Sequence, residues 1–236
     1  MRLVRNRDYV WGPEPYLDDI TVRFTGAAST AIAALRNGQA DIIAPQPSAG
    51  TESLFDGLAE QGNTIQRFSQ SGYDHLDLNF SGPFADKDVR EAFLKTVPRQ
   101  KIVDDVVGGF VADAKPLDSQ VFLPAQPKYR DAVKGNGSAN YSDVDIKGAR
   151  SKLRDAAPTI RVLYNKDNPN RVRAFSLIRE SARLAGFSVE EAGLGSSDWA
   201  KAPGGGSYDA AIFGAIGPGV GVGRVPPLSK TGDGSN

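Results

Sequence analysis

TIRVLY, residues 159–164, is the stretch on which the fold class depends, because its apolar residues predict a strand. Apolar residues at helical spacing then predict a long helix over 172–185, which Gly186 ends. FSV, residues 187–189, predicts a second strand. YDAAIF, residues 208–213, is a continuous apolar run that predicts a strand covered on both faces. A strand, a helix and two further strands indicate an α/β layer.

The sequence before this layer predicts a further strand and two helices. Residues 73–80 alternate between polar and apolar, which predicts a strand with Leu76, Leu78 and Phe80 on one face. Apolar residues at helical spacing predict a helix that Asp86 or Asp88 opens and Pro98 ends, and a second helix up to 108. Residues 117–141 are rich in Pro, Gly, Asn and Ser and predict a long excursion, and a short helix is expected around 149–153.

The first 72 residues predict a separate strand, helix and strand. Residues 20–24 alternate like a half-buried strand, and a helix follows that Ser29 or Thr30 can cap. Gly38 stands where a left-handed residue is needed, and residues 42–43 are expected to begin the next strand. A looser stretch follows, and we expect a domain boundary between residues 72 and 73.

Composition excludes several classes of function. The 236 residues include 28 Lys and Arg against 28 Asp and Glu, scattered along the chain, which argues against a nucleic-acid or anionic-membrane partner. There are no cysteines. No apolar run reaches the roughly 20 residues that span a bilayer, and the first residues lack the apolar stretch of a secretory signal. An exported protein would carry that signal upstream of this sequence.

No residue pattern indicates catalysis, a cofactor or a metal. His75 is the only histidine, and the sequence shows neither a Gly-x-Ser-x-Gly motif nor a second ligand cluster around His75 and Asp77. The glycine-rich stretches at 204–206 and 217–223 lack the Gly-Lys-Ser/Thr ending of a phosphate loop. Trp11 and Trp199 are expected to pack over loops rather than to contact a ligand. We therefore predict a binding protein, not an enzyme.

Four segments in this order resemble a known family. They are LVRNRDYVWGPEPYLDDI at 3–20; AALRNGQADI at 33–42; LNF, PF, DVREAF and RQKIV between 78 and 103; and NPNR, AGFSV and YDAAIFG between 168 and 214. Together they are similar to the family 5 solute-binding proteins of ABC importers, the dipeptide, oligopeptide and nickel-binding class. The chain departs from the pattern at Val10, which is inserted, and at TVP, residues 96–98, where the family has Ala-Ile-Asp.

The resemblance implies the bilobal type II fold of periplasmic binding proteins. Residues 1–72 would be a remnant of lobe I with the crossover to lobe II, and residues 73–236 would be lobe II, truncated at its C-terminal end. The resemblance also implies an extracytoplasmic, membrane-anchored lipoprotein, with signal and lipid anchor outside this sequence. Its function would be to capture a peptide-like or other small solute between two lobes and deliver it to ABC permease subunits. The alternative is the ligand-sensing domain of a transcription regulator with the same fold, which would need an upstream DNA-binding segment.

Two loops are predicted to bind the ligand, because ligands of open α/β sheets bind beyond the carboxyl ends of the strands. One follows the predicted strand that ends at Tyr164, where Lys166 is the best single polar contact. The other follows Phe213, where small residues would let main-chain groups pair with an extended ligand. The predicted site residues are Tyr164, Asn165, Lys166, Asn168, Phe213, Gly214, Ala215, Ile216 and Gly217.

The second loop lacks one residue that the resemblance implies. Dipeptide-binding relatives commonly place an acid there to hold the free amino group of the ligand, and residues 214–223 contain none. A buried ammonium without a partner costs several kcal/mol. The sequence therefore argues against a free dipeptide as the ligand.

Overall fold

The computed structural model describes residues 1–48, 51–67, 72–119, 122–124, 126–199 and 208–216. The chain divides into two compact units, Met1–Pro47 and Ser48–Asn236. The first contains an antiparallel pair of strands, β1 (Arg2–Val4) and β2 (Asp19–Thr21), and helix α1 (Ala28–Arg36). The division falls earlier than the expected boundary at 72, and the assignment of lobes stays a prediction.

The first unit corrects three details of the predicted pattern. Ile20 of β2 is 47% exposed, so the strand is not half-buried. Helix α1 has Ala27 as its N-cap, with no side-chain cap bond, so the predicted cap by Ser29 or Thr30 is wrong. Ile42 is exposed, and residues 42–43 do not begin a strand, so the predicted strand is wrong. These two apolar residues have no strand partner among the described residues. The left-handed conformation predicted for Gly38 is confirmed by its φ of 66°.

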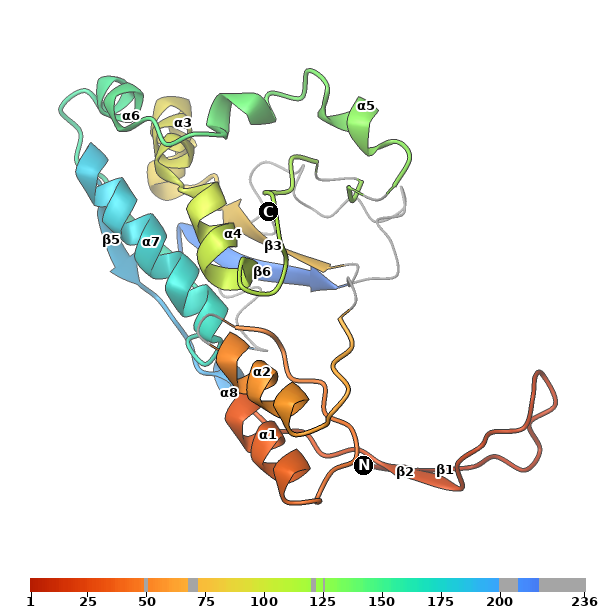
Figure 1. Cartoon of the computed structure of the whole chain (residues 1–236). Helices are drawn as coiled ribbons and strands as arrows, with labels where there is room; N and C mark the ends of the chain where they lie inside the picture. Colours follow the sequence, from red (N-terminus) through yellow and green to blue (C-terminus); the bar gives the residue numbers. More distant parts are fainter. Residues whose placement is uncertain (49–50, 68–71, 120–121, 125, 200–207, 217–236) are drawn as a thin grey trace. The chain divides into compact units, whose positions relative to one another are not determined.

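The second unit is built on a four-stranded sheet in the order β3-β6-β4-β5 (Figure 1). Strand β3 (Gly72–Leu78) pairs antiparallel with β6 (Ala210–Ile216) over all seven residues. Strand β4 (Thr159–Leu163) pairs parallel with both β6 and β5 (Ser188–Glu191). Each strand overlaps the stretch that its apolar pattern predicts, and the α/β layer is confirmed.

The helices of the second unit mostly follow the predicted spacing. Helix α3 begins after Asp86, whose side chain accepts the main-chain N–H of Asp88, as predicted. Helix α2 was not predicted and lies in the stretch taken as loose. The 117–141 segment contains α5 and one short 3-10 helix, η2. The helices are α2 (Glu52–Glu60), η1 (Gly82–Ala85), α3 (Lys87–Thr96), α4 (Arg99–Val107), α5 (Tyr129–Val133), η2 (Ser138–Tyr141), α6 (Ile146–Leu153), α7 (Pro169–Ala185) and α8 (Ser196–Trp199). In the described ranges no helix is both long and apolar enough to cross a membrane.

The main core lies between one face of the sheet and helices α3, α6 and α7. Alternate residues of β6, Ala210 and Ile212, face this side, as the pleat of a strand requires. Phe93 of α3 is fully buried between Phe84, 5.2 Å away, and Phe187, 5.3 Å away, measured between ring centroids. Figure 1 shows α7 running beside β5, against which it packs.

The opposite face of the sheet carries a smaller apolar cluster. It contains Leu163, Tyr208 and Ala211, against which Trp199 and Phe213 pack. The sheet therefore has apolar residues on both faces of β6, as the continuous run at 208–213 predicts.

Candidate functional site

The connections of the sheet reverse direction between β4 and β6. Helix α7 carries the chain from β4 to β5 on one side, and the chain then returns past α8 to β6 on the other side of β4. In open α/β sheets such a reversal creates a crevice at the carboxyl ends of the two strands, and ligands bind there. The candidate site is therefore the region beyond Leu163 of β4 and Ala211 of β6.

Strands β4 and β6 separate at this point. They pair only at Val162 with Ala210 and at Leu163 with Ala211. Beyond these pairs the continuation of β4 follows β5 instead, since the main-chain N–H of Lys166 donates to Leu194 O over 3.0 Å. Within the described residues, the edge of β6 that faces β4 thus has no partner from Ile212 to Ile216.

The loop predicted after Tyr164 is held by its own side chains. The side-chain Oδ1 of Asn165 accepts the main-chain N–H of Asp167 over 2.9 Å, and its side-chain Nδ2 donates to Ser196 Oγ over 3.2 Å. Asn168 caps α7, because its side-chain oxygen accepts the main-chain N–H groups of Asn170 and Arg171. These amides shape the loop, so little of their hydrogen-bonding capacity is left for a ligand.

Asp167 and Lys166 complete this loop. The Ser196 main-chain N–H donates to the Asp167 carboxylate over 2.7 Å and, with the Ser196 hydroxyl, lowers the pKa of Asp167. Lys166 is exposed on the same loop. Its ammonium is the group that this loop can offer to an anion.

Tyr164 belongs to the core. It is 3% exposed and stacks on Phe175 with ring centroids 4.7 Å apart. Burial, and secondarily the Glu191 carboxylate, raises the pKa of Tyr164 to about 12. The hydroxyl therefore stays protonated at neutral pH, and the buried ring anchors the start of the loop in the core.

The second predicted loop is part of a strand. β6 does not end at Phe213, because Gly214, Ala215 and Ile216 continue its ladder with β3, so the predicted strand end is wrong. Pairing with β3 extends the strand past the glycine that looked like a turn residue. Gly217 lies outside the described residues.

Three further residues meet beside Gly214 and were not among the predicted site residues. Arg171 Nη2, from the first turn of α7, lies 3.5 Å from Asp74 Oδ1 of β3. The Arg171 guanidinium also lies 5.3 Å from the ring centroid of Trp199. Trp199 packs on Phe213 with ring centroids 4.9 Å apart, so its predicted packing role is confirmed, whereas Trp11 is 80% exposed.

His75 and Asp77 form a side-chain pair on β3. His75 Nδ1 and Asp77 Oδ1 are 2.8 Å apart, and the imidazole stacks against Phe213 at 6.4 Å. Across the described ranges, His, Asp and Glu form no group of three or more that could hold a metal ion. The pair is a structural element next to the crevice.

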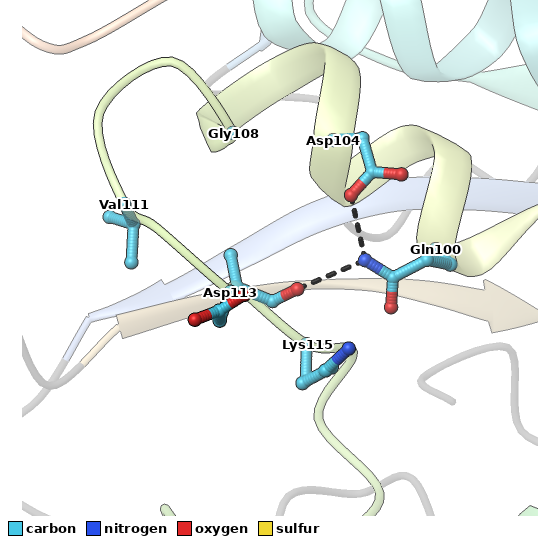
Figure 2. Close-up of a pocket in the computed structure, with 7 residues that line it drawn as sticks. Gln100, Asp104, Gly108, Val111, Asp113 and Lys115 are labelled. Atoms are coloured by element: carbon cyan, nitrogen blue, oxygen red, sulfur yellow. Dashed lines mark hydrogen bonds between the residues drawn. The ribbon is translucent and has the colours of Figure 1, made fainter.

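A cavity of about 360 Å³ lies beside α4, and none of its lining residues belongs to a strand. Figure 2 shows these residues. Gln100 on its wall donates to Asp104 Oδ1 over 2.7 Å and to the Ala114 carbonyl over 3.0 Å, as the dashed lines mark. Asp113 and Lys115 complete a polar rim. Because the one amide on the wall is already bonded within the protein, this cavity is a weaker candidate than the crevice.

Solved structures with the same fold include periplasmic binding proteins. The periplasmic EDTA-binding protein EppA superposes with a TM-score of 0.76 at 22% identity, covering 91% of this chain and 43% of that one. The Helicobacter pylori protein DppA, in complex with the peptide STSA, superposes at 0.74 and 20% identity, covering 96% and 42%. A Pseudoalteromonas sp. SM9913 dipeptide-binding protein, in complex with Met-Leu, superposes at 0.71 and 20% identity, covering 95% and 43%. No curated protein matches.

The fold is that of the bilobal type II periplasmic binding proteins, and the chain spans less than half the length of these structures. The names of these solved proteins describe them as binding proteins. Residues 1–223 match the model of the bacterial extracellular solute-binding proteins, family 5 middle region. The chain therefore belongs to the family 5 bacterial extracellular solute-binding proteins.

Proposed function

We propose that this chain is part of a substrate-binding protein that captures a peptide-like or other small solute between two lobes and hands it to the permease of an ABC importer. The open edge of β6 carries the proposal. It lies at the crevice between β4 and β6, where the family fold and the strand order both favour ligand binding.

The edge of β6 suits an extended ligand. From Ile212 to Ile216 its main-chain N–H and C=O groups on the side of β4 have no strand partner among the described residues. An extended peptide can pair with such an edge as an added strand, and main-chain hydrogen bonds then supply affinity without reading side chains. Gly214 lies in the middle of this edge and adds no side chain of its own.

The predicted site residues have two different roles in this proposal. Phe213 to Gly217 would pair with the ligand backbone, and the loop from Tyr164 to Asn168 would close one end of the crevice, with Lys166 as its cation. The peptides STSA and Met-Leu, bound to two proteins of the same fold, support a peptide-like ligand. EppA, which is named as an EDTA-binding protein, supports small anionic solutes as an alternative. A lipid anchor outside this sequence would hold the protein at the membrane.

Pairing through the main chain is testable with modified peptides. We expect a peptide that the protein binds to lose at least tenfold in affinity when the N–H groups facing β6 are methylated, because methylation removes the donors and blocks the edge. Isothermal titration calorimetry of the bilobal protein measures both affinities. Methylation of an N–H at the solvent-facing end of the peptide is the matched control. Equal affinities for the two methylated peptides would contradict strand addition.

If two lobes close on the ligand, the affinity should depend on both lobes. The 236-residue chain should bind the same peptide at least a hundredfold more weakly than the bilobal protein, because part of the contact surface is absent. Equal affinities would show that the second lobe contributes nothing to binding.

A further inference from the structure

An asparagine directly precedes a glycine at two places in the sequence, Asn37–Gly38 and Asn136–Gly137. The main-chain nitrogen that follows an asparagine can attack the side-chain amide and form a five-membered ring. Glycine in the second position favours this attack, because it adds no side chain and reaches conformations closed to other residues. Both asparagines are exposed, so access of water does not distinguish the two sites. Their hydrogen bonds do.

The side chain of Asn37 is free to turn. Asn37 is the C-cap of α1, with φ of −88° and ψ of 6°. Among the described residues its side-chain amide has no hydrogen-bond partner. A Cβ placed on Gly38 would meet no atom within 4 Å, so a ring formed between these two residues has open space on that side.

The attacking nitrogen at this site is held only by the end of a helix. The main-chain N–H of Gly38 donates to Leu35 O over 3.0 Å, which closes the last turn of α1. Helix ends open at little cost in free energy, because few hydrogen bonds hold their last groups. The Gly38 nitrogen is therefore released far more easily than one inside a helix.

Asn136 has the same neighbour, but its side chain is held at both ends. Its Nδ2 donates to the main-chain oxygen of Asp118 over 2.7 Å, and its Oδ1 accepts the main-chain N–H of Ser138 over 3.0 Å. Asp118 is held in turn, since Arg99 Nη2 donates to its Oδ1 over 2.7 Å. Ring formation at Asn136 would have to break the bond of Nδ2 and turn the amide out of the plane that both bonds fix.

We infer that Asn37 is a site of spontaneous deamidation, and that its bond to Asp118 protects Asn136 from the same reaction. The Gly38 nitrogen gives its proton to solvent and attacks Cγ of Asn37. The bond from Cγ to Nδ2 breaks, and the side-chain nitrogen takes up a proton and leaves as ammonia. One water molecule then opens the cyclic imide at either carbonyl, which gives aspartate or isoaspartate.

The product changes the end of α1. Either form of it carries a negative charge at the C-terminal end of the helix, where the helix dipole is already negative. Isoaspartate also adds one carbon atom to the main chain between residues 37 and 38. Both changes weaken the last turn of α1, and neither depends on the solute that the protein binds.

The test follows both sites in one sample. The bilobal protein is incubated in mildly alkaline buffer, folded and in concentrated urea, and peptide mass spectrometry measures the gain of one mass unit at each asparagine. In the folded protein we expect Asn37 to react at least tenfold faster than Asn136. In urea the two rates should lie within threefold of each other, because both asparagines then have only glycine as a determinant.

Two variants separate the sites. Asn37→Gln should stop the reaction at position 37 and leave Asn136 unchanged, because the longer side chain closes the ring far more slowly. Arg99→Gln should raise the rate at Asn136 severalfold and leave Asn37 unchanged, because it loosens Asp118. Equal rates at the two sites in the folded protein, or a faster rate at Asn136, would overturn the assignment of Asn37. An unchanged rate at Asn136 in Arg99→Gln would overturn its protection by Asp118.

Discussion

Arg154 is held in a backbone conformation that residues with a side chain rarely adopt. It follows α6 with φ of 56° and ψ of −116°, in a region suited to glycine. Its side chain is 82% exposed, and its nearest carboxylate, Asp88 Oδ2, is 3.9 Å from Nη2. Exposed pairs at this distance contribute little. The strain at Arg154 therefore has no visible compensation from its side chain.

Substituting this residue tests the strain directly. Arg154→Gly should raise the free energy of unfolding by about 1 kcal/mol, because glycine adopts the observed φ and ψ without a steric penalty. Arg150→Gly, inside the same helix, is the control and should lower it by about 1 kcal/mol. Urea unfolding followed by circular dichroism measures both. A loss of stability in Arg154→Gly would show that the side chain matters more than the backbone.

Asp209 stabilises the approach of β6 to β4. Its carboxylate accepts the main-chain N–H of Arg161 over 2.8 Å and the guanidinium through both oxygens, at 3.2 and 3.3 Å. The same carboxylate raises the pKa of Arg161 through these bonds and its charge. The Asp209 side chain is only 7% exposed, so its charge depends on these donors.

Replacing Asp209 by asparagine should cost about 2 kcal/mol of unfolding free energy. The amide puts a donor against the donors of Arg161 and removes the negative charge. Denaturant unfolding measures the loss, and Asp198→Asn, at an exposed position on α8, should change stability little. Equal effects at the two positions would contradict the role of Asp209.

At the scale of elements, α6 depends on a charged N-cap. Asp145 Oδ1 accepts the Gly148 main-chain N–H over 2.7 Å, and Oδ2 accepts from Lys95 Nζ over 2.9 Å. The Lys95 ammonium first, and the Gly148 N–H second, lower the pKa of Asp145. The carboxylate therefore joins the end of α3 to the start of α6.

The lowered pKa of Asp145 makes part of the stability depend on pH. Because the pKa is lower in the folded state, this contribution is present above the unfolded value of about 4 and is lost as pH falls through the folded value. Asp145→Asn should thus be less stable than the native chain at pH 7, and the gap should narrow towards pH 3. Denaturant midpoints across that range measure this gap. Lys95→Gln should retain part of the pH dependence, and a constant gap would contradict the expectation.

Most helices and strands could be predicted from the sequence, because the spacing of apolar residues and the residues that begin or end a helix are local signals. The side chains of Asp86 and Asn168 cap the starts of α3 and α7, and Gly186 ends α7 in the left-handed conformation that suits glycine. Helix α2 was missed because it is only nine residues long and Gly57 interrupts its apolar pattern. The end of β6 was misplaced because Gly214 resembles a turn residue, whereas pairing with β3, far away in sequence, decides the boundary.

The candidate site was predictable only in part, for a related reason. The loop after Tyr164 follows directly from the strand pattern. Arg171 was not among the predicted site residues, since spacing alone cannot show a partner such as Asp74, which lies 97 residues away in sequence. Only the assembled sheet brings these groups to Gly214.

At the scale of the whole molecule, the order of strands decides where a ligand can bind. The chain crosses from β4 outward to β5 and then back to β6, so two strands part at a point that no single motif marks. The solved proteins of the same fold are more than twice as long as this chain. The wall that faces the β6 edge in the proposed function would come from the rest of such a protein.

The open edge of β6 also affects the solubility of the protein. An unpaired strand edge can template a strand of another molecule, and proteins usually protect such edges with charges, irregularities or a cover. Beside this edge the structure places Arg171 and Asp74, and Gly214 interrupts its apolar residues. These two charges would thus discourage self-association through this edge, and a bound solute would complete the protection.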